Sequence, residues 1–270
     1  MTISHMAFIG GGNMASAIMG GLRRQGMAAE QFIVIEPHAP QREKLLAEFG
    51  ISALEQPDQS LARAKQIVWA VKPQTFREAA AQVAGHTKAA LHLSVMAGIT
   101  SSSMAQQLAT QRIVRAMPNT PALIGKGIAG LYAREAVSDA DKLTIEALMA
   151  TTGEHVWVTD ENHLDAVTAL SGSGPAYVFF FIEAMMRAGQ SMGLSQGQAR
   201  QLAQSTFAGA AELARQSPES PEILRQRVTS KGGTTYAAIT AMQNSQMSEH
   251  FEQALLAAGQ RAAELGREFG

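Results

Sequence analysis

The chain has 270 residues, of which 46% are hydrophobic and 17% charged, and its formal net charge is −1 at pH 7. This length favours two domains of ordinary size over one. The balanced charge excludes the strongly basic surface that binds nucleic acid or an acidic membrane. The chain has no cysteine, so disulfides, thiolate nucleophiles and iron–sulfur clusters are excluded and a reducing compartment is expected.

Neither a metal site nor a membrane segment is predicted. The seven histidines are scattered, with no pair at helical spacing, so a metal site built from them would need distant partners. The N-terminus has no basic segment followed by an apolar core, so we expect no signal peptide. The strongest apolar run, AYVFFFI at residues 176–182, is far shorter than the roughly 20 residues that cross a bilayer. We therefore expect a cytoplasmic protein without membrane or nucleic-acid partners.

Short β-branched runs alternate with amphipathic stretches in the first part of the chain. Strands are predicted at residues 3–9, 32–35, 66–71, 90–95, 112–117, 127–132 and 155–158. Helices are predicted between them, for example at residues 14–24, 41–49, 74–83 and 138–151. This alternation is typical of an α/β domain, in which right-handed crossovers build a doubly wound, mostly parallel sheet.

After Asp160 the strand pattern stops, and the rest of the chain reads as alanine-rich helices. We therefore predict an α/β domain at residues 1–160 and an all-α domain at residues 161–270. Stretches such as AGAAELA and ALLAAGQRAAEL let helices approach closely. Such thin helices bury too little surface alone, so packing against a second copy is favoured over an ordinary helical bundle.

The stretch FIGGGNMASAI, residues 8–18, places a glycine-rich turn between a strand and a helix. Gly10, Gly12 and Ala15 fit the pattern G-x-G-x-x-[GA]. The first glycine permits the tight turn, the second leaves room for a pyrophosphate, and the alanine lets the helix pack on the strand. Free N–H groups at the helix start then bind the phosphates. Because a βαβ pattern follows, the stretch predicts a dinucleotide site in a Rossmann-type domain.

The strand after this loop ends at Glu36, where a ribose-binding acid would lie. A carboxylate there accepts hydrogen bonds from both ribose hydroxyls and repels a 2′-phosphate, which favours NAD. His38 and Arg42 follow at once and could bind that phosphate, and Glu36 could also be a plain exposed residue at the end of a strand. The sequence leaves the choice between NADH and NADPH open.

A second glycine-rich stretch, VTSKGGTTYAAI at residues 228–239, precedes another apolar helix. Ser230 is a candidate N-cap, while Gly232 and Gly233 permit close approach to the backbone. Thr234 and Thr235 begin the helix, whose free amides can bind a small carboxylate. The alternative, an ordinary capped helix start, needs a serine or threonine but not two glycines and two threonines.

The helical half contains no activated nucleophile, no paired carboxylates in a common motif and no His–Asp pair. Hydride transfer needs none of these when the acceptor is already electrophilic. A protonated imine is such an acceptor, because it requires orientation more than a strong acid. A threonine hydroxyl could hold or relay the imine proton. A ketone would usually require a lysine, histidine or arginine beside its carbonyl, and none is conspicuous in these loops.

With these residues, the chain resembles the pyrroline-5-carboxylate reductases, the enzymes of the last step of proline biosynthesis. The resemblance runs through FIGGGNMASAI, AVKPQ (70–74), MAGIT (96–100), MPNTP (117–121), LSGSGPAY (170–177) and, most specifically, VTSKGGTTYAAI. It implies a reduced nicotinamide cofactor, usually NADPH, and pyrroline-5-carboxylate as the small-molecule substrate. It also implies a C-terminal domain that forms a homodimer, and it leaves further assembly of dimers and inhibition by proline open.

The loops and the resemblance together assign the site residues. The cofactor-binding residues would be Gly10, Gly11, Gly12, Asn13, Met14, Glu36, Ala70, Val71, Lys72, Pro73, Val95, Met96, Ala97 and Asn119. The substrate-binding residues would be Ser173, Ser230, Gly232, Gly233, Thr234 and Thr235. The hydroxyl of Thr235 would face the imine nitrogen, which makes this residue catalytic.

Two residues depart from the family pattern. Glu36 replaces the small or polar residue that many members carry, which weakens the inference of NADPH. Lys231 replaces a common proline and is either a charge partner for the substrate or a solvated surface residue.

Two other functions are compatible with parts of the sequence. A β-hydroxyacid dehydrogenase shares the first loop and a helical second domain, but its family carries a catalytic lysine in a G-x-x-x-K context. The corresponding region here carries Glu183 and Arg187 and no lysine. A non-catalytic NADP-responsive regulator would leave the second loop unexplained.

Overall fold

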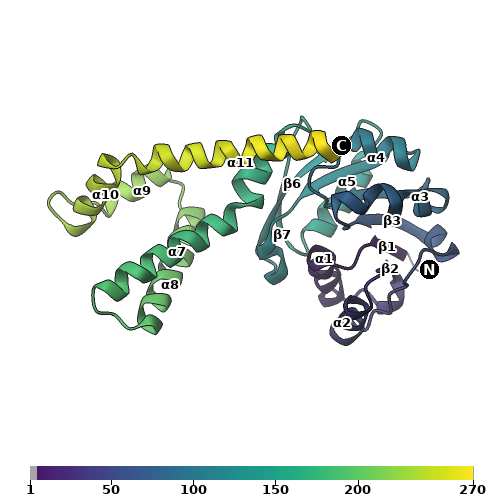
Figure 1. The fold of residues 1–270 in the computed structure, drawn as a ribbon, viewed down its shortest axis with the longest axis horizontal. Helices are drawn as coiled ribbons and strands as arrows, with labels where there is room; N and C mark the ends of the chain where they lie inside the picture. The colour runs from purple at the N-terminus through teal and green to yellow at the C-terminus, as the bar shows by residue number, and fades with distance from the viewer. Residues whose placement is uncertain (1–4, 270) are drawn as a thin grey trace. The chain divides into compact units, whose positions relative to one another are not determined.

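The computed structural model describes residues 5–269, which form two compact units. Unit 1 extends to Ser173 and also includes the chain from Ala258 onward, and unit 2 comprises Gly174–Ala257. Figure 1 shows the course of the chain by colour. The units therefore divide the chain after Ser173, whereas the sequence pattern changes near residue 160.

Unit 1 is built on a seven-stranded sheet in the order β2-β1-β3-β4-β5-β6-β7. Its strands are β1 (His5–Ile9), β2 (Phe32–Ile35), β3 (Ala64–Trp69), β4 (Leu91–Ser94), β5 (Ile113–Met117), β6 (Gly127–Ala133) and β7 (Gly153–Trp157). Neighbouring strands are parallel, except that β6 is antiparallel to β5. The predicted parallel sheet is thus confirmed, although residues 3 and 4 of its first predicted strand lie outside the described range.

Helices cover both faces of this sheet. They are α1 (Asn13–Arg24), α2 (Ala39–Phe49), α3 (Phe76–Thr87), α4 (Ser101–Leu108), α5 (Asp139–Met149) and α6 (His163–Val167). Successive side chains of a strand point to opposite faces, so Phe8 packs in one apolar layer and Ala7 in the other. Burial on both faces explains why the strands read as continuous apolar runs.

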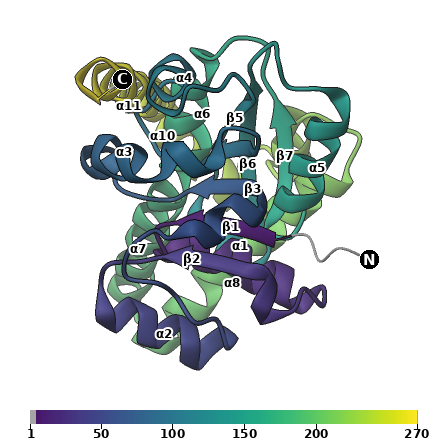
Figure 2. The ribbon, with the colours of Figure 1, turned by 90° about the vertical axis from the view of Figure 1, so that its right-hand side faces the viewer.

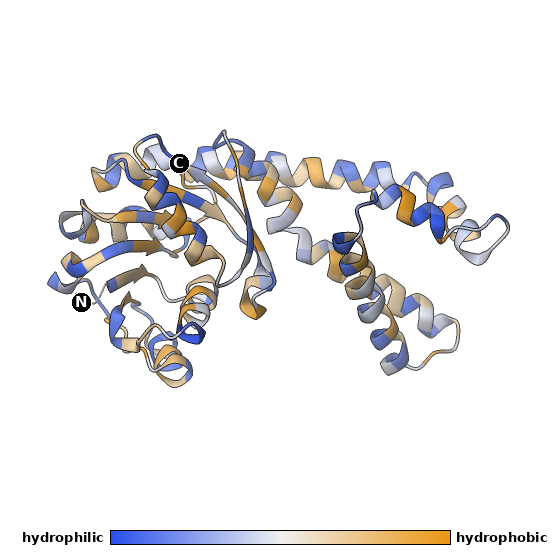
Figure 3. Cartoon of the chain, turned by 180° about the vertical axis from the view of Figure 1, so that it is seen from behind, coloured by the Kyte–Doolittle hydropathy of each residue, from blue (hydrophilic) through white to orange (hydrophobic). Residues whose placement is uncertain are grey.

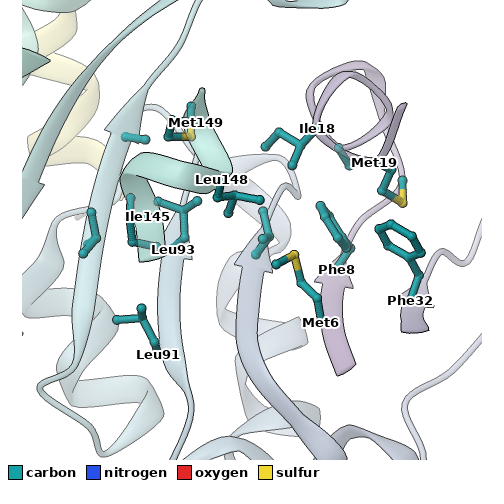
Figure 4. Close-up of a cluster of buried hydrophobic side chains, with 14 of the residues drawn as sticks. Met6, Phe8, Ile18, Met19, Phe32, Leu91, Leu93, Ile145, Leu148 and Met149 are labelled. Carbon is teal, nitrogen blue, oxygen red and sulfur yellow. The ribbon is translucent and has the colours of Figure 1, made fainter. Parts of the chain in front are cut away.

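The two apolar layers use different helices. One layer joins strand residues such as Phe8 to Ile18 of α1 and Ile145 of α5 (Figure 4). Leu45 of α2 belongs to the same layer. The other layer joins the opposite face of the strands to α3 and α4, and Figure 2 shows these two helices together on one side of the sheet. This arrangement confirms the predicted doubly wound fold.

The end of the chain completes unit 1. The last turns of α11 (Met247–Phe269) lie beside α4 in both Figure 1 and Figure 2. A Cβ added at Gly98 would come within 3.2 Å of the Leu265 carbonyl oxygen, which shows how closely this helix approaches the loop after β4. Phe269 packs against the apolar layer formed with α3 and α4. The C-terminal residues therefore belong to the packing of unit 1.

Unit 2 contains helices throughout its described length. They are α7 (Gly174–Ser191), α8 (Gln196–Gln216), α9 (Pro221–Arg227), α10 (Thr234–Asn244) and the first part of α11. Its buried side chains are small, as at Ala199 and Ala203, while Phe179 and Phe180 are 59% and 62% exposed. Figure 3 shows hydrophobic residues spread along these helices. One copy of the chain therefore gives unit 2 very little hydrophobic core.

The described residues show neither a spanning segment nor a metal cluster. None of their helices combines the length and the hydropathy that crossing a membrane requires. Their histidine, aspartate and glutamate side chains do not gather into a group that could hold a metal ion.

Candidate active site

The carboxyl ends of β1 and β3 form the point at which the strand order reverses. From β1 the sheet extends one way to β2 and the other way through β3 to β5, and open α/β sheets bind ligands at such a point. Gly10 follows β1 with φ +94°, and a Cβ there would lie 2.6 Å from the carbonyl oxygen of Ala70, the residue that follows β3. Only glycine fits between these two strand ends.

Helix α1 begins at this crevice without a side-chain cap. Its N-cap is Gly12, and no side chain accepts a hydrogen bond from its first amides. Other helices are capped by a hydroxyl, from Thr100, Ser138, Ser195 and Ser220. A Cβ built at Gly12 would meet no atom within 4 Å, so open space lies in front of the backbone there. A pyrophosphate fits such a helix start.

A cavity of about 390 Å³ lies beside this loop, a volume within the usual range for small-molecule sites. Six of the predicted cofactor residues line it, namely Gly10, Gly12, Glu36, Ala70, Val71 and Lys72. The other predicted cofactor residues lie outside its lining: Gly11, Asn13, Met14, Pro73, Val95, Met96, Ala97 and Asn119. The structure therefore gathers the two loop motifs and Glu36 around one cavity.

The apolar residues that line the cavity were not predicted from the sequence. Pro57 lines it from the loop before β3, and Ala79 and Val83 line it from α3. These residues belong to no motif, and the two helix residues read as ordinary positions of an amphipathic helix. Such an apolar lining suits a flat aromatic group such as adenine, because binding removes apolar surface from water.

Glu36 lines the cavity and is held in place by backbone N–H groups. Its Oε2 accepts a hydrogen bond from the N–H of Gly11 at 2.8 Å, and its Oε1 accepts one from the N–H of His38 at 2.9 Å. Arg42 lies nearby, but its Nη1 donates to the carbonyl oxygens of Glu36 at 3.0 Å and Pro37 at 2.6 Å. The carboxylate therefore faces the glycine loop, and the guanidinium holds the turn after β2.

Asn119, predicted to lie near the nicotinamide, uses both ends of its side chain within the protein. Its Nδ2 donates to the carbonyl oxygen of Ser171 at 3.1 Å, and its Oδ1 accepts from the N–H of Ile128 at 3.0 Å. The side chain is 9% exposed. Asn119 therefore joins the loop after β5 to the segment that leads to Ser173, whose own N–H donates to the Thr168 carbonyl at 2.8 Å.

Helix α10 of unit 2 begins in the same way as α1. It starts at Thr234 with Gly233 as its N-cap and has no side-chain cap. The prediction of Ser230 as N-cap was wrong, because Gly232 has φ +78° and the chain makes one more turn before the helix. In that turn the Ser230 carbonyl accepts the N–H of Gly233 at 3.0 Å. The first amides of α10 have no acceptor within the helix, so this start can also bind an anion.

Each unit thus holds one glycine-capped helix start, and the threonines of the second differ in exposure. Thr234 is exposed, whereas Thr235 is half-buried. Lys231, on the tip of the loop, is exposed. A small anion bound to the amides of α10 would therefore have one sheltered hydroxyl beside it.

Comparison with known proteins also divides the chain into an N-terminal and a C-terminal part. Residues 161–265 match the family described as pyrroline-5-carboxylate reductase dimerisation, and residues 5–98 match that of NADP oxidoreductase, coenzyme F420-dependent. The chain is 44% identical to a pyrroline-5-carboxylate reductase of Pseudomonas aeruginosa, with 100% of each chain covered.

Solved structures give the same result. A pyrroline-5-carboxylate reductase from Coxiella burnetii is 36% identical, with a TM-score of 0.90 over 98% of this chain and 99% of that chain. The Plasmodium falciparum pyrroline carboxylate reductase with NADP bound shares the fold, at 24% identity and a TM-score of 0.87 over 97% and 98% of the two chains. With its two glycine-capped helix starts and these likenesses, the chain belongs to the pyrroline-5-carboxylate reductase family.

Proposed function

We propose that the two glycine-capped helix starts divide the work of a reductase between cofactor and substrate. The reaction is the last step of proline biosynthesis, in which NAD(P)H transfers a hydride to 1-pyrroline-5-carboxylate and L-proline is formed. The observation that supports this division is that both α1 and α10 begin at an uncapped glycine, at Gly12 and Gly233. Each start can therefore bind one anionic group, the pyrophosphate at α1 and the substrate carboxylate at α10.

Unit 1 would hold the cofactor, which supplies the hydride when it is bound. The amides that follow Gly12 would bind the pyrophosphate. The cavity lined by Pro57 and Val83 would receive the adenine, with Glu36 at the ribose. Residues 95–97 follow β4 at the same edge of the sheet, and we assign them to the nicotinamide side.

Unit 2 would hold the substrate through backbone and hydroxyl groups. The N–H groups of Thr234 and Thr235 would donate to the carboxylate of pyrroline-5-carboxylate. The half-buried hydroxyl of Thr235 would hold the proton of the imine nitrogen, which keeps the imine carbon electrophilic. The side chain of Thr234 is exposed and takes no part in this arrangement. Orientation of an already electrophilic acceptor then lowers the barrier without a strong acid.

The chain forms homo-oligomers through its dimerisation domain, and we propose that the basic unit is a homodimer. The support is the apolar surface of unit 2, where Phe179, Phe180 and Leu202 are each more than half exposed. Exposed apolar surface of this extent is rare on a monomer. A second copy related by a twofold axis would cover the same surface on both chains.

Paired threonine variants test the assignment of the second loop. Thr235→Val keeps the branched shape but removes the hydroxyl, so kcat should fall on the order of 10- to 100-fold, or about 1.4 to 2.7 kcal/mol. Thr235→Ser should recover most of this loss. Thr234→Ala keeps its amide and should change kcat little. Equal losses in Thr234→Ala and Thr235→Val would contradict a specific role for the Thr235 hydroxyl.

Substrate choice separates this function from its alternatives. Oxidation of NAD(P)H should be seen with pyrroline-5-carboxylate, and 3-hydroxy acids should give no reduction of NAD(P)⁺. A β-hydroxyacid dehydrogenase would show the reverse. A non-catalytic regulator would bind the dinucleotide without any turnover.

A further inference from the structure

We infer that the ribose subsite of this chain is built for a free 2′-hydroxyl, that NADH therefore binds more tightly than NADPH, and that Glu36 makes this selection. The inference rests on the proposed reductase function and refines its cofactor. It sets this chain apart from the relative whose structure holds NADP. Three features of the described residues carry it.

The first feature is the fixed position of the Glu36 carboxylate. An ionised carboxylate has about four acceptor positions, and two of them are used by the N–H groups of Gly11 at 2.8 Å and His38 at 2.9 Å. These two bonds hold the side chain in place before any ligand arrives, so little conformational entropy is lost on binding. The two remaining positions match the two hydroxyls of an unmodified ribose. A phosphate in place of the 2′-hydroxyl has no proton to donate when fully ionised.

The second feature is that the guanidinium of Arg42 already binds other groups of the protein. Its Nη1 donates to the carbonyl oxygens of Glu36 and Pro37, and its Nη2 lies 3.4 Å from the carboxylate of Glu55. An arginine that binds a phosphate usually presents two parallel N–H groups to it. Either parallel pair of the guanidinium includes Nη2, so presenting it to a phosphate would draw Nη2 away from Glu55, while Nη1 stays directed at the turn after β2. We assign it to holding that turn.

The third feature is the charge of the cavity wall. Three carboxylates line the cavity, those of Glu36, Glu55 and Glu78, against the ammonium of Lys72 and the imidazole of His38. Lys72 follows β3, and β1 separates that strand from β2, which puts the strand ends about 10 Å apart. A 2′-phosphate would bring a charge of about −1.5 to −2 to this wall. The excess of negative charge on this wall opposes the binding of such a group.

Binding measurements without substrate test the inference directly. Isothermal titration of the full chain with NADH and with NADPH, at one fixed salt concentration, gives the two Kd values. We expect NADH to bind more tightly on the order of tenfold or more. In Glu36→Ser the ratio of the Kd of NADPH to the Kd of NADH should fall to about one or below one, so that NADPH binds as tightly as NADH or more tightly. Glu43→Gln removes an exposed carboxylate of α2 outside the cavity lining and should leave the ratio unchanged.

Two further variants separate the roles of the neighbouring residues. Arg42→Met should weaken both cofactors by similar factors, because it disturbs the turn that positions Glu36. A loss confined to NADPH would show that Arg42 binds the phosphate and would overturn the inference. Glu55→Gln removes one negative charge from the cavity lining. The Glu55 side chain is 68% exposed, so the substitution should leave the glycine loop intact and lower the ratio of the Kd of NADPH to that of NADH. It serves as the test variant if Glu36→Ser does not fold.

The outcomes distinguish this inference from the proposed function. Equal or tighter binding of NADPH by the unmodified chain would overturn the inference, as would an unchanged ratio in Glu36→Ser. Failure of both dinucleotides to bind would overturn the inference and the proposed function together. Tight, selective binding of NADH without turnover of pyrroline-5-carboxylate would support the subsite and contradict the reductase function alone.

Discussion

Acid should destabilise the fold through one buried histidine. His92 lies in β4 and is 0% exposed. Its Nδ1 accepts a hydrogen bond from Nε1–H of Trp69 at 2.9 Å, and its Nε2 lies 3.0 Å from the carbonyl oxygen of Thr87. Both ring nitrogens are therefore satisfied only in the neutral form with the proton on Nε2. Burial is the main cause that lowers the pKa of His92 from 6.5 to about 4.

The sign and size of the effect follow from the two pKa values. In the unfolded chain the imidazole takes up a proton as the pH falls below 6.5, while in the folded chain it stays neutral down to about pH 4. The stabilisation is therefore fully present above pH 6.5 and is lost between pH 6.5 and about 4. At about 1.4 kcal/mol per pH unit, this loss amounts to about 3 kcal/mol in the free energy of unfolding.

Urea unfolding at fixed protein concentration, at several pH values between 7 and 4, measures this change, and His92→Asn supplies the control. The asparagine Oδ1 takes the place of Nδ1 as acceptor for Trp69, and the Thr87 carbonyl still accepts the N–H of Ala90 at 3.0 Å. The variant should be less stable at pH 7 but should lose less stability in acid. Identical pH dependence in the two proteins, or an NMR titration of His92 near pH 6.5, would refute the reasoning.

Two further predictions concern the first loop and the assembly. Gly12→Ala should fold as well as the original chain, because its Cβ enters open space, but its methyl group should block the phosphates and weaken dinucleotide binding at least about tenfold. In the control, Gly85→Ala in α3, the Cβ also meets no atom, and the dinucleotide affinity measured by titration should stay unchanged. Light scattering at micromolar concentration should give at least twice the chain mass of 28.7 kDa, and a stable, active monomer would contradict the proposed homodimer.

The fold could be predicted because its local requirements are visible in the residues. Strands buried on both faces appear as apolar runs, and β2 has the predicted bounds, Phe32–Ile35. The helix predicted at residues 74–83 instead spans Phe76–Thr87, because Pro73–Thr75 form a short 3₁₀ turn and Gly85 does not interrupt the helix. The return of the chain from Ala258 to unit 1 could not be predicted, because α11 keeps one alanine-rich pattern along its length.

The site was predictable where the backbone itself demands a residue type. At Gly10 the positive φ and the close carbonyl oxygen of Ala70 exclude any other residue, so the glycine pattern predicts the turn between β1 and α1. Ala79 and Val83 of the cavity wall were missed, since only long-range packing brings α3 to that loop. The cap of α10 was misplaced because no sequence pattern shows that Gly232 has a positive φ.

The division of unit 1 between the two ends of the chain has a consequence for its synthesis. Residues up to Ser173 leave the ribosome first, but part of their packing is provided by Leu265 and Phe269. At about 5–20 residues per second, translation of the intervening helices delays these contacts on the order of 10 s. During this time the nascent chain carries the exposed apolar helices of unit 2 while the older unit is still incomplete. A chain truncated by a few C-terminal residues would therefore lack contacts in unit 1, the part of the protein that is synthesised first.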